Sequence, residues 1–396
     1  MDKPEYPHKA IGSVDALAQS LGTNPSALKN LVSKVDNSYT PILISTNNGT
    51  KERQVYEPKY YLKKIQKRIN REIFEKVKFP TYLQGSIRDV KNTRDFVKNA
   101  GVHSGANDLI SLDITGFYDH IKEEYVSDIF TKLFSFPPDV SEILTKLVTY
   151  KGIVPQGACT SSYVANLVFF NSEYRVYSRL KNRHNVKYTR LLDDVTLSSE
   201  RRLTDKELTI CIDEVKSLFR KYDLKSNDSK KKVQTRKFHG HLDFQVTGLW
   251  VGHKTPRLRK KERRYIRQLV YSCEREYERD STKTEYHELW NRTSGKVAKM
   301  ARLNHSQSRA LRERLKKVLP TYNQDQAETL IYNIKRFVDK VKKNKIKSDP
   351  AKTKNFNTLV YQVNILTRTN KSLANSLRLQ LMSIRKSVNL KSALWD

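Results

Sequence analysis

The sequence feature that most constrains the fold is a pair of adjacent acids, Asp193-Asp194, set between two apolar runs. Residues 186–192 and 195–198 are typical of extended strands, so the pair is expected at a tight turn between them. Adjacent carboxylates in apolar surroundings lose hydration and repel each other, and bound cations would offset both effects. A solvated surface turn is the alternative for an isolated pair, but the apolar flanks argue against it.

A third acid, Asp113, lies near the end of another apolar run, residues 109–114, which is typical of a buried strand. Three carboxylates meet the preference of Mg²⁺ for hard oxygen ligands. Two such ions about 3.5–4 Å apart activate a 3′-hydroxyl and stabilise a pyrophosphate leaving group. We therefore expect two Mg²⁺ ions as cofactors, with Mn²⁺ as a substitute.

Charge points to the partner. The 75 Lys and Arg residues exceed the 42 Asp and Glu residues, which gives a net charge of +33. A polyanion, above all nucleic acid, is the simplest partner for such an excess. The alternative explanation of the charge excess is that these lysines are only solvated surface residues. Membrane-surface binding is a weaker one, because no basic amphipathic segment stands apart from the rest.

The remaining compositional signals narrow the class of protein. No run of about 18 apolar residues predicts a transmembrane helix, and residues 1–13 lack the apolar stretch of a secretory signal. We therefore expect a cytoplasmic protein without membrane contact. The three cysteines are far apart and form no CxxC pair, which argues against a disulfide framework or a structural zinc site. His239 and His241 form an HxH pair that is a weak metal candidate beside a plain surface turn.

The chain changes character along its length. Residues 1–50 read as a helical lead, with Ser13 and Asn24-Pro25-Ser26 at helix starts and a hairpin-type turn at 47–49. Basic residues alternate with tyrosines over 51–68, which suits nucleic-acid contact or an ordinary charged helix face. Strands and helices then alternate, and a capping box at Thr204 and Glu207 begins one helix. After Gly252 the pattern is almost all helical, so the fold class is α/β with an α+β core.

The acids lie in recognisable motifs. SLDITGFYDHI, GIVPQGACTSSYVANL and YTRLLDDVTLSS, at 111–121, 152–167 and 188–199, resemble three motifs of reverse transcriptases in order and spacing. NAGVH at 99–103 fits the NAxxH signature, and VTG at 246–248 the VTG signature, of retron-type bacterial reverse transcriptases. The resemblance covers about residues 15–345.

This resemblance implies a right-hand polymerase in four parts. Residues 1–50 would form the N-terminal helical region, 51–252 the fingers and palm, 253–346 an RNA-binding thumb and 347–396 a C-terminal helical extension.

It also implies residue roles. The metal ligands would be Asp113, Asp193 and Asp194. Tyr118 would block a ribose 2′-hydroxyl, although a core tyrosine is the alternative. The other substrate contacts would be Ile114 through its carbonyl, Gln156, Lys230, Arg53 and Arg94. The residues expected to bind RNA, or to support the structure that binds it, are Asn99, His103, Val246, Thr247, Gly248, Arg257, Lys260, Arg263 and Arg264. A purely structural His103 is equally open.

The sequence departs from the family pattern in two places. Leu191 and Leu192 stand where an aromatic and a small residue usually precede the paired acids, which removes a hydroxyl beside the primer end. Cys159 and Ser162 replace prolines common in the PQG motif. We expect catalysis to persist, with altered fidelity or nucleotide affinity.

The implied activity is the copying of one structured noncoding RNA into single-stranded DNA from dNTPs, primed by a 2′-hydroxyl. The product would be an RNA–DNA hybrid, and a separate effector protein would act with it in antiphage defence. Another defence-associated reverse transcriptase or a relative of group II intron proteins is an alternative, although no HNH endonuclease motif is visible. A non-catalytic RNA-binding scaffold is a third reading, weakened by the survival of all three acids.

Overall fold

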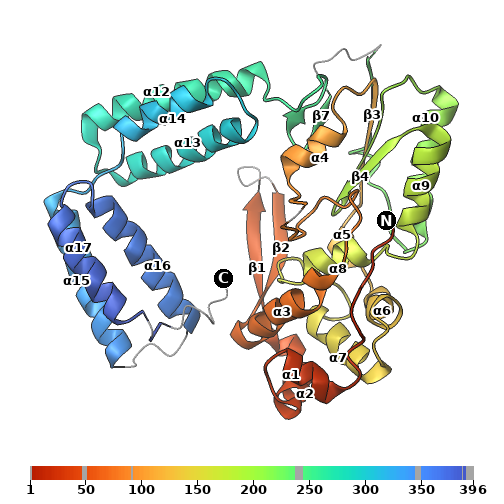
Figure 1. The fold of residues 1–396 in the computed structure, drawn as a ribbon, viewed down its shortest axis with the longest axis horizontal. Helices are drawn as coiled ribbons and strands as arrows, with labels where there is room; N and C mark the ends of the chain where they lie inside the picture. Colours follow the sequence, from red (N-terminus) through yellow and green to blue (C-terminus); the bar gives the residue numbers. More distant parts are fainter. Residues whose placement is uncertain are drawn as a thin grey trace. The chain divides into compact units, whose positions relative to one another are not determined.

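The computed structural model describes residues 2–46, 51–90, 92–236, 244–343, 349–385 and 387–388. The chain divides into two compact units, Met1–Arg257 and Leu258–Asp396. The first unit contains all the strands described below and the second consists of helices, as Figure 1 shows. The α+β class predicted from the sequence is confirmed for the first unit.

The N-terminal helices begin where the sequence predicts. Helix α1 (Val14–Ser20) is capped by Ser13, whose hydroxyl accepts from the Ala16 amide at 3.2 Å. Helix α2 (Pro25–Ser33) is capped by the side chain of Asn24, and a short turn of helix, η1 (Val35–Ser38), follows. Each cap satisfies an amide that has no partner within the helix.

The prediction of a helical lead is wrong beyond residue 38. Strand β1 (Tyr39–Thr46) pairs antiparallel with β2 (Lys51–Pro58) in a two-stranded ribbon. The β-branched and aromatic residues of β1 favour an extended chain and outweigh the helical pattern before it. The predicted turn at 47–49 lies outside the described residues. The basic and tyrosine-rich stretch 51–68 is likewise divided between β2 and helix α3 (Tyr60–Glu72).

A four-stranded antiparallel sheet forms the centre of the first unit. Its order is β4 (Lys187–Leu191), β5 (Asp194–Ser199), β3 (Asp108–Asp113) and β6 (Lys232–Thr235). Both apolar runs beside the paired acids and the run before Asp113 are thus strands, as predicted. Helices α9 (Glu173–His184) and α10 (Asp205–Arg220) run alongside this sheet (Figure 1), and the Thr204–Glu207 capping box begins α10.

The remaining elements of the first unit surround the sheet, and most of them share its apolar core. They are η2 (Phe74–Lys76), α4 (Phe96–Val102), α5 (Phe117–His120), α6 (Glu123–Asp128), η3 (Ile129–Leu133), α7 (Pro138–Val148), α8 (Ser161–Leu167) and the hairpin of β7 (Gln245–Val246) and β8 (Leu249–Trp250). Phe74, Phe130 and Phe134 are buried and pack against one another, with ring centroids 5.8–6.0 Å apart. This packing fixes the helical side of the unit.

The second unit consists of two groups of three helices. The first group is α12 (Lys260–Asp280), α13 (Thr284–Arg302) and α14 (Ser308–Lys317), and the second is α15 (Gln324–Lys342), α16 (Asp349–Leu366) and α17 (Lys371–Ser383). The second group has its own apolar core, to which Ile334, Val363 and Leu377 contribute buried side chains. Among the described residues, no helix is both long and apolar enough to cross a membrane.

Candidate active site

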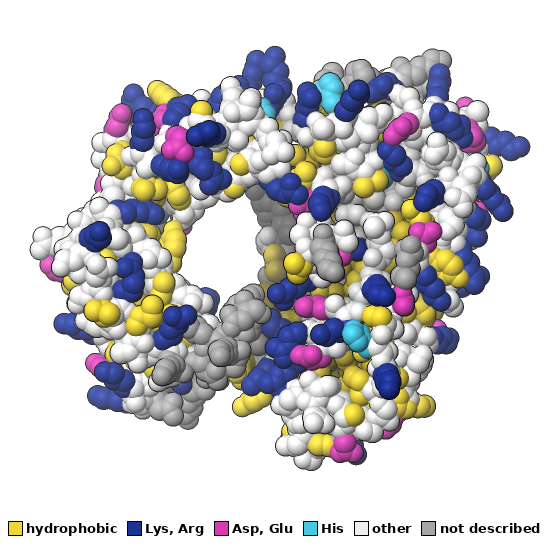
Figure 2. Space-filling model, in the orientation of Figure 1, with side chains coloured by type: hydrophobic (Ala, Val, Ile, Leu, Met, Phe, Trp, Pro, Cys, Tyr) yellow, Lys and Arg dark blue, Asp and Glu magenta, His cyan; other side chains and the backbone are white. Residues whose placement is uncertain are grey.

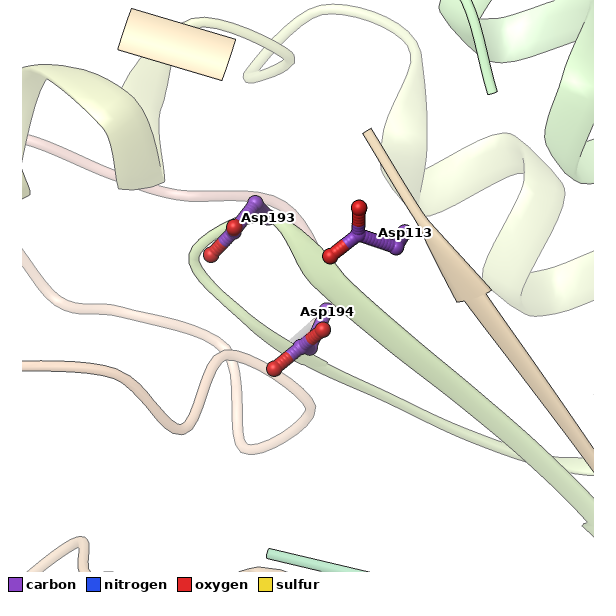
Figure 3. Close-up of side chains that lie close together, drawn as sticks. All are labelled: Asp113, Asp193 and Asp194. Carbon is purple, nitrogen blue, oxygen red and sulfur yellow. The ribbon is translucent and has the colours of Figure 1, made fainter. Parts of the chain in front are cut away.

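Three aspartates meet at one end of the central sheet (Figure 3). Asp113 ends β3 and lies directly opposite Asp194, the first residue of β5, while Asp193 occupies the turn just before it. One carboxylate oxygen from each residue lies within 4.8 Å of the others. Asp113 is buried, Asp193 half-buried and Asp194 exposed. We call these three residues the aspartate triad. Its clustered hard oxygen donors fit divalent cations such as Mg²⁺.

A loop after α10 brings a cation to the triad. The Asn227 amide donates to the Asp113 carbonyl at 2.7 Å, and the Thr115 amide donates to the Lys225 carbonyl at 2.9 Å. These bonds hold the loop against the end of β3. The Lys230 ammonium then lies 2.8 Å from both carboxylate oxygens of Asp113. Part of the negative charge of the triad is therefore neutralised within the chain itself.

The turn that carries Asp193 is tightly constrained. Leu192 has φ +60°, a left-handed backbone conformation that residues other than glycine rarely adopt. Gly85 lies against it, since a Cβ on Gly85 would be 2.9 Å from Leu192 Cγ and 3.1 Å from its amide nitrogen. The Ile114 amide donates to the Asp193 carbonyl at 3.2 Å. The Leu192 departure noted in the sequence therefore falls at the strained position of the turn.

A buried ion pair lies beneath this turn. The fully buried Arg190 guanidinium donates to both carboxylate oxygens of Glu173 at 2.6 and 2.7 Å. It also donates to the Leu192 carbonyl at 3.1 Å and to the Ala165 carbonyl at 2.9 Å. Paired and fully hydrogen-bonded, the charges are compensated, and they tie the turn to α8 and α9.

Crowding of the carboxylates shifts their proton affinity. Loss of hydration, followed by repulsion from Asp193 and Asp113, raises the pKa of Asp194 to about 6. Loss of hydration also raises the pKa of Asp193, with a further contribution from Asp113. Like charges held this close disfavour ionisation, and divalent cations would reverse that penalty.

The triad opens into a cleft of about 770 Å³ that collects most of the predicted substrate contacts. The cleft is lined by Asp113 and Asp193 together with Ile114, Tyr118, Gln156, Lys230 and Arg53. These residues come from segments up to 177 positions apart in the chain (230 − 53). The resemblance assigned them to one site, and the structure brings them to one cleft.

The PQG loop and the β1–β2 ribbon form one wall of this cleft. The Tyr56 amide donates to the Gln156 carbonyl at 2.7 Å. Gly157 has φ +108°, and a Cβ there would lie 3.1 Å from the Tyr56 carbonyl oxygen. A glycine is therefore required for this close approach. Tyr118 is half-buried beside Phe117, and burial, reinforced by the nearby Asp193, raises its pKa to about 12.

Several cleft residues were not predicted from the sequence, among them three polar ones. Asp119 follows Tyr118 within the first quoted motif, Asn227 begins the Asn-Asp-Ser-Lys stretch that ends at Lys230, and Glu52 precedes Arg53. Their neighbours in the sequence were the only signal, and nothing in these residues alone placed them at a site.

Arg94 does not reach the cleft. Its side chain is 5% exposed and donates to the Pro80 and Leu83 carbonyls at 2.6 Å and to the Phe79 carbonyl at 2.8 Å. Asp89 lies 3.5 Å from the guanidinium. The predicted substrate contact is therefore not supported for Arg94, because carbonyls and a carboxylate already engage its donors.

The NAxxH residues are buried. The ring of His103 is fully enclosed, with Nδ1 2.7 Å from Ser198 Oγ and Nε2 2.7 Å from Thr189 Oγ1. It ties α4 to β4 and β5. Burial, with the nearby Lys187 charge, lowers the pKa of His103 to about 3, so the ring is neutral. Asn99 is 2% exposed. Direct RNA contact is corrected here to structural support, the alternative left open by the sequence.

The VTG triplet forms the turn of the β7–β8 hairpin. Thr247 and Gly248 have φ +50° and +74°, as a two-residue hairpin turn with two left-handed positions requires. The Thr247 hydroxyl donates to the Phe96 carbonyl at 2.8 Å, at the start of α4, and Val246 is buried. The two signature motifs are therefore joined physically, through α4.

The predicted basic contacts occupy different environments. Arg257 is exposed and its backbone pairs with Trp250 at the end of the first unit. Lys260 and Arg264 are exposed on α12 of the second unit, and Arg263 beside them is half-buried. Lys and Arg side chains are also scattered over the face drawn in Figure 2. The His239–His241 pair lies outside the described residues, and all three cysteines are free thiols.

Comparison with known proteins gives one consistent result. Residues 46–266 match the family described as reverse transcriptase (RNA-dependent DNA polymerase). The Retron Se72 reverse transcriptase of Salmonella heidelberg (strain 579083-10) is 42% identical over 390 residues, covering 97% of this chain and 99% of that protein. The Retron Ec48 reverse transcriptase of Escherichia coli is 32% identical, covering 78% and 77%. The Retron Ec86 reverse transcriptase of Escherichia coli is 31% identical, covering 37% and 44%.

Proposed function

This chain belongs to the retron-type reverse transcriptases, which are RNA-directed DNA polymerases, and from that premise we propose that it copies part of one cognate structured noncoding RNA into single-stranded DNA. The first nucleotide is joined to a 2′-hydroxyl of the RNA, so the product is a branched RNA–DNA hybrid. The enzyme acts in the bacterial cytoplasm, in antiphage defence, with a separate effector protein. Relatives named as retron enzymes support this proposal across nearly the whole chain.

One observation carries the catalytic part of the proposal. A single cleft contains two members of the aspartate triad, the Tyr118 ring, Gln156 and Lys230. Metal ligands, an aromatic ring and a cation within one cleft are what a polymerase needs to hold a deoxynucleoside triphosphate beside a primer end.

Each residue then has a role in nucleotide transfer. Asp113, Asp193 and Asp194 would hold two Mg²⁺ ions, with the Ile114 carbonyl alongside. When bound, these ions would supply charge stabilisation for the attacking hydroxyl and the pyrophosphate. Lys230, which neutralises Asp113 here, pairs with the triphosphate. The ring of Tyr118 excludes a ribose 2′-hydroxyl, while Gln156 and Arg53 contact the incoming nucleotide.

The RNA is held by charge outside the cleft. Arg257, Lys260, Arg263 and Arg264 contact its phosphates, in the region assigned to the RNA-binding thumb at 253–346. Such contacts recognise the shape of a folded RNA and not its sequence. Helices α16 and α17, beyond residue 346, form a helical extension of this region.

The decisive test replaces one metal ligand. Asp193→Asn should reduce dNTP incorporation on poly(rA)–oligo(dT) with Mg²⁺ by more than about 100-fold, because loss of outer partners of a metal site alone costs about 10- to 100-fold. RNA binding, measured by fluorescence anisotropy, should be unchanged. Asp213→Asn makes the same chemical change on exposed α10 and should retain full synthesis. Normal synthesis by Asp193→Asn would refute the metal assignment.

The retron chemistry needs a second test. The protein would be purified from cells that carry its native neighbouring DNA, and its nucleic acid would be treated with RNase, DNase and debranching enzyme. One discrete DNA whose mobility changes on debranching would establish the 2′-linked product. Bound RNA without DNA, in the presence of dNTPs and Mg²⁺, would favour a non-catalytic scaffold.

A further inference from the structure

A second pocket, of about 690 Å³, lies outside the active-site cleft and shares no lining residue with it. It is enclosed by residues 81–84, helix α4, the C-terminal half of α9 and strand β4. Gly101 and Val102, the two variable positions of NAGVH, line it, while Asn99 and His103 of the same motif are buried. The buried pair therefore holds in place a wall whose other residues are open to a ligand.

Aromatic rings form the pocket's apolar side. Tyr82 and Tyr177 have ring centroids 4.7 Å apart, and Tyr188 stands edge-on to Tyr82 at 5.7 Å. Tyr82 and Tyr188 are buried, whereas Tyr177 is half-buried. The ring of Tyr177 is thus the one available for stacking against another flat ring.

Two lysines supply charge at the pocket's edge. Lys98 on α4 and Lys181 on α9 are exposed, and the Lys181 ammonium lies 5.6 Å from the centre of the Tyr177 ring. The charge of Lys187 is already compensated by Glu200, 2.6 Å away. None of the lining residues that the structure describes is Asp or Glu. The pocket therefore favours an anionic ligand.

The wall of the pocket also contains a buried acceptor without a partner. Gln84 is 8% exposed and lines the pocket, and its Oε1 has no hydrogen-bond partner among the described residues. Its Nε2 donates to the Thr81 carbonyl at 2.5 Å, so the amide is fixed in orientation. A buried acceptor without a partner costs stability unless a ligand or water donates to it.

These features together describe the chemistry of one ligand. An aromatic face, two cations and no acid suit a flat ring with an attached phosphate. The volume falls in the usual range of about 300–1,000 Å³ for ligand pockets. We propose that this pocket binds an unpaired nucleotide of RNA, with its base stacked on Tyr177 and its phosphates at Lys98 and Lys181. This inference rests on the proposed function, in which the chain binds RNA.

Salt dependence tests the lysines. The full chain would be mixed with labelled RNA oligomers of random sequence, each about 16 nucleotides long. Fluorescence anisotropy would measure their binding over a range of salt concentrations. Lys98→Glu/Lys181→Glu should lower the slope of log K against log salt by about 1.4, or 0.7 for each phosphate contact. Lys206→Glu/Arg220→Glu changes the charge equally on exposed α10 and should leave the slope unchanged. Equal slopes in the two variants would overturn the proposal.

A crosslink locates the base. The same oligomers carrying 4-thiouridine should crosslink to peptides within 81–102 or 177–189. Tyr177→Leu, which keeps an apolar side chain, should weaken RNA binding about 5-fold or more. Crosslinks confined to other peptides would overturn the proposal. DNA oligomers of the same length that bind and crosslink equally well would overturn the assignment to RNA.

The polymerase itself is tested separately. Wild-type protein that fails to extend poly(rA)–oligo(dT) but gives the expected crosslinks would refute the proposed catalysis and leave the pocket standing. Extension of poly(rA)–oligo(dT) without these crosslinks would support the proposed catalysis and overturn the proposal for the pocket.

Discussion

Individual side chains of the cleft serve more than one purpose. Lys230 neutralises Asp113 through two 2.8 Å contacts, although the resemblance places it near the triphosphate. Both roles require a cation at the same point, because the triphosphate would be held beside the carboxylates of the triad. Tyr118 likewise packs against Phe117 and lines the cleft, so the core reading and the functional reading of this residue are compatible.

Tyr118 provides the first prediction at the level of the residue. Tyr118→Ala removes the ring that would meet a ribose 2′-hydroxyl, so incorporation of ribonucleotides relative to deoxynucleotides should rise by roughly 10- to 100-fold. Single-nucleotide extension with each triphosphate measures this ratio. Tyr118→Phe keeps the ring and should keep the selectivity. An unchanged ratio in Tyr118→Ala would mean that the ring only packs.

His103 gives a prediction about acid stability. Its pKa is about 3 in the folded chain and about 6.5 in the unfolded chain, so the unfolded state binds more protons between these values. Stability therefore falls as the pH drops below 6.5, by about 2 kcal/mol between pH 7 and pH 5. His103→Asn should be less stable at pH 7 but should lack this contribution. Urea unfolding of both proteins at the two pH values measures it, and equal losses would contradict the assignment.

Among the elements, the β4–β5 hairpin shows how secondary structure positions chemistry. The register of β5 against β3 sets Asp194 opposite Asp113, and the turn of the hairpin holds Asp193 through a left-handed Leu192. The buried Arg190 guanidinium donates a hydrogen bond to the Leu192 carbonyl in this turn. A hairpin held from several sides keeps its carboxylates fixed before metals bind, which reduces the reorganisation that catalysis would otherwise require.

Gly85 tests this constraint. A Cβ in Gly85→Ala would lie 3.1 Å from the Leu192 amide, so the turn must shift and DNA synthesis should fall by about 10- to 100-fold. Gly85→Ala/Leu192→Ala removes the side-chain clash and should recover part of the rate. Gly12→Ala, which meets no atom within 4 Å, is the matched control. Primer extension measures all three, and full activity in Gly85→Ala would show that the turn tolerates movement.

For the whole molecule, the net charge of +33 is the dominant property. Lysines and arginines occur in both units, on α4 and α9 as well as on α12. A polyanion can therefore be attracted to several parts of the chain, and the cleft needs only to select and align what the surface has already attracted.

Salt should therefore control RNA affinity. If about six phosphates are contacted, raising the salt from about 50 to about 200 mM should weaken binding by about 100-fold or more. Anisotropy with the RNA purified from native cells measures this loss. A change of less than about threefold would mean that the charge is not used for RNA.

Strong local patterns and motifs were predictable from the sequence. The apolar runs around Asp113 and Asp193-Asp194 gave three strands of the sheet, and the caps at Ser13 and Thr204 gave two helix starts. These signals depend on neighbours in the chain, so they survive without tertiary information. The family resemblance then named residues that the structure brings to one cleft.

Tertiary structure alone decided the rest. The lead past residue 38 has β-branched and aromatic residues that favour an extended chain, but only its pairing with β2 fixes it as a strand. The family resemblance assigned roles to Arg94 and His103, but nearby carbonyls and one carboxylate engage Arg94, and hydroxyls from β4 and β5 engage His103. The second pocket joins residues from four separate segments. Burial and long-range pairing depend on contacts between residues that are far apart in the chain, and local sequence patterns do not show these contacts.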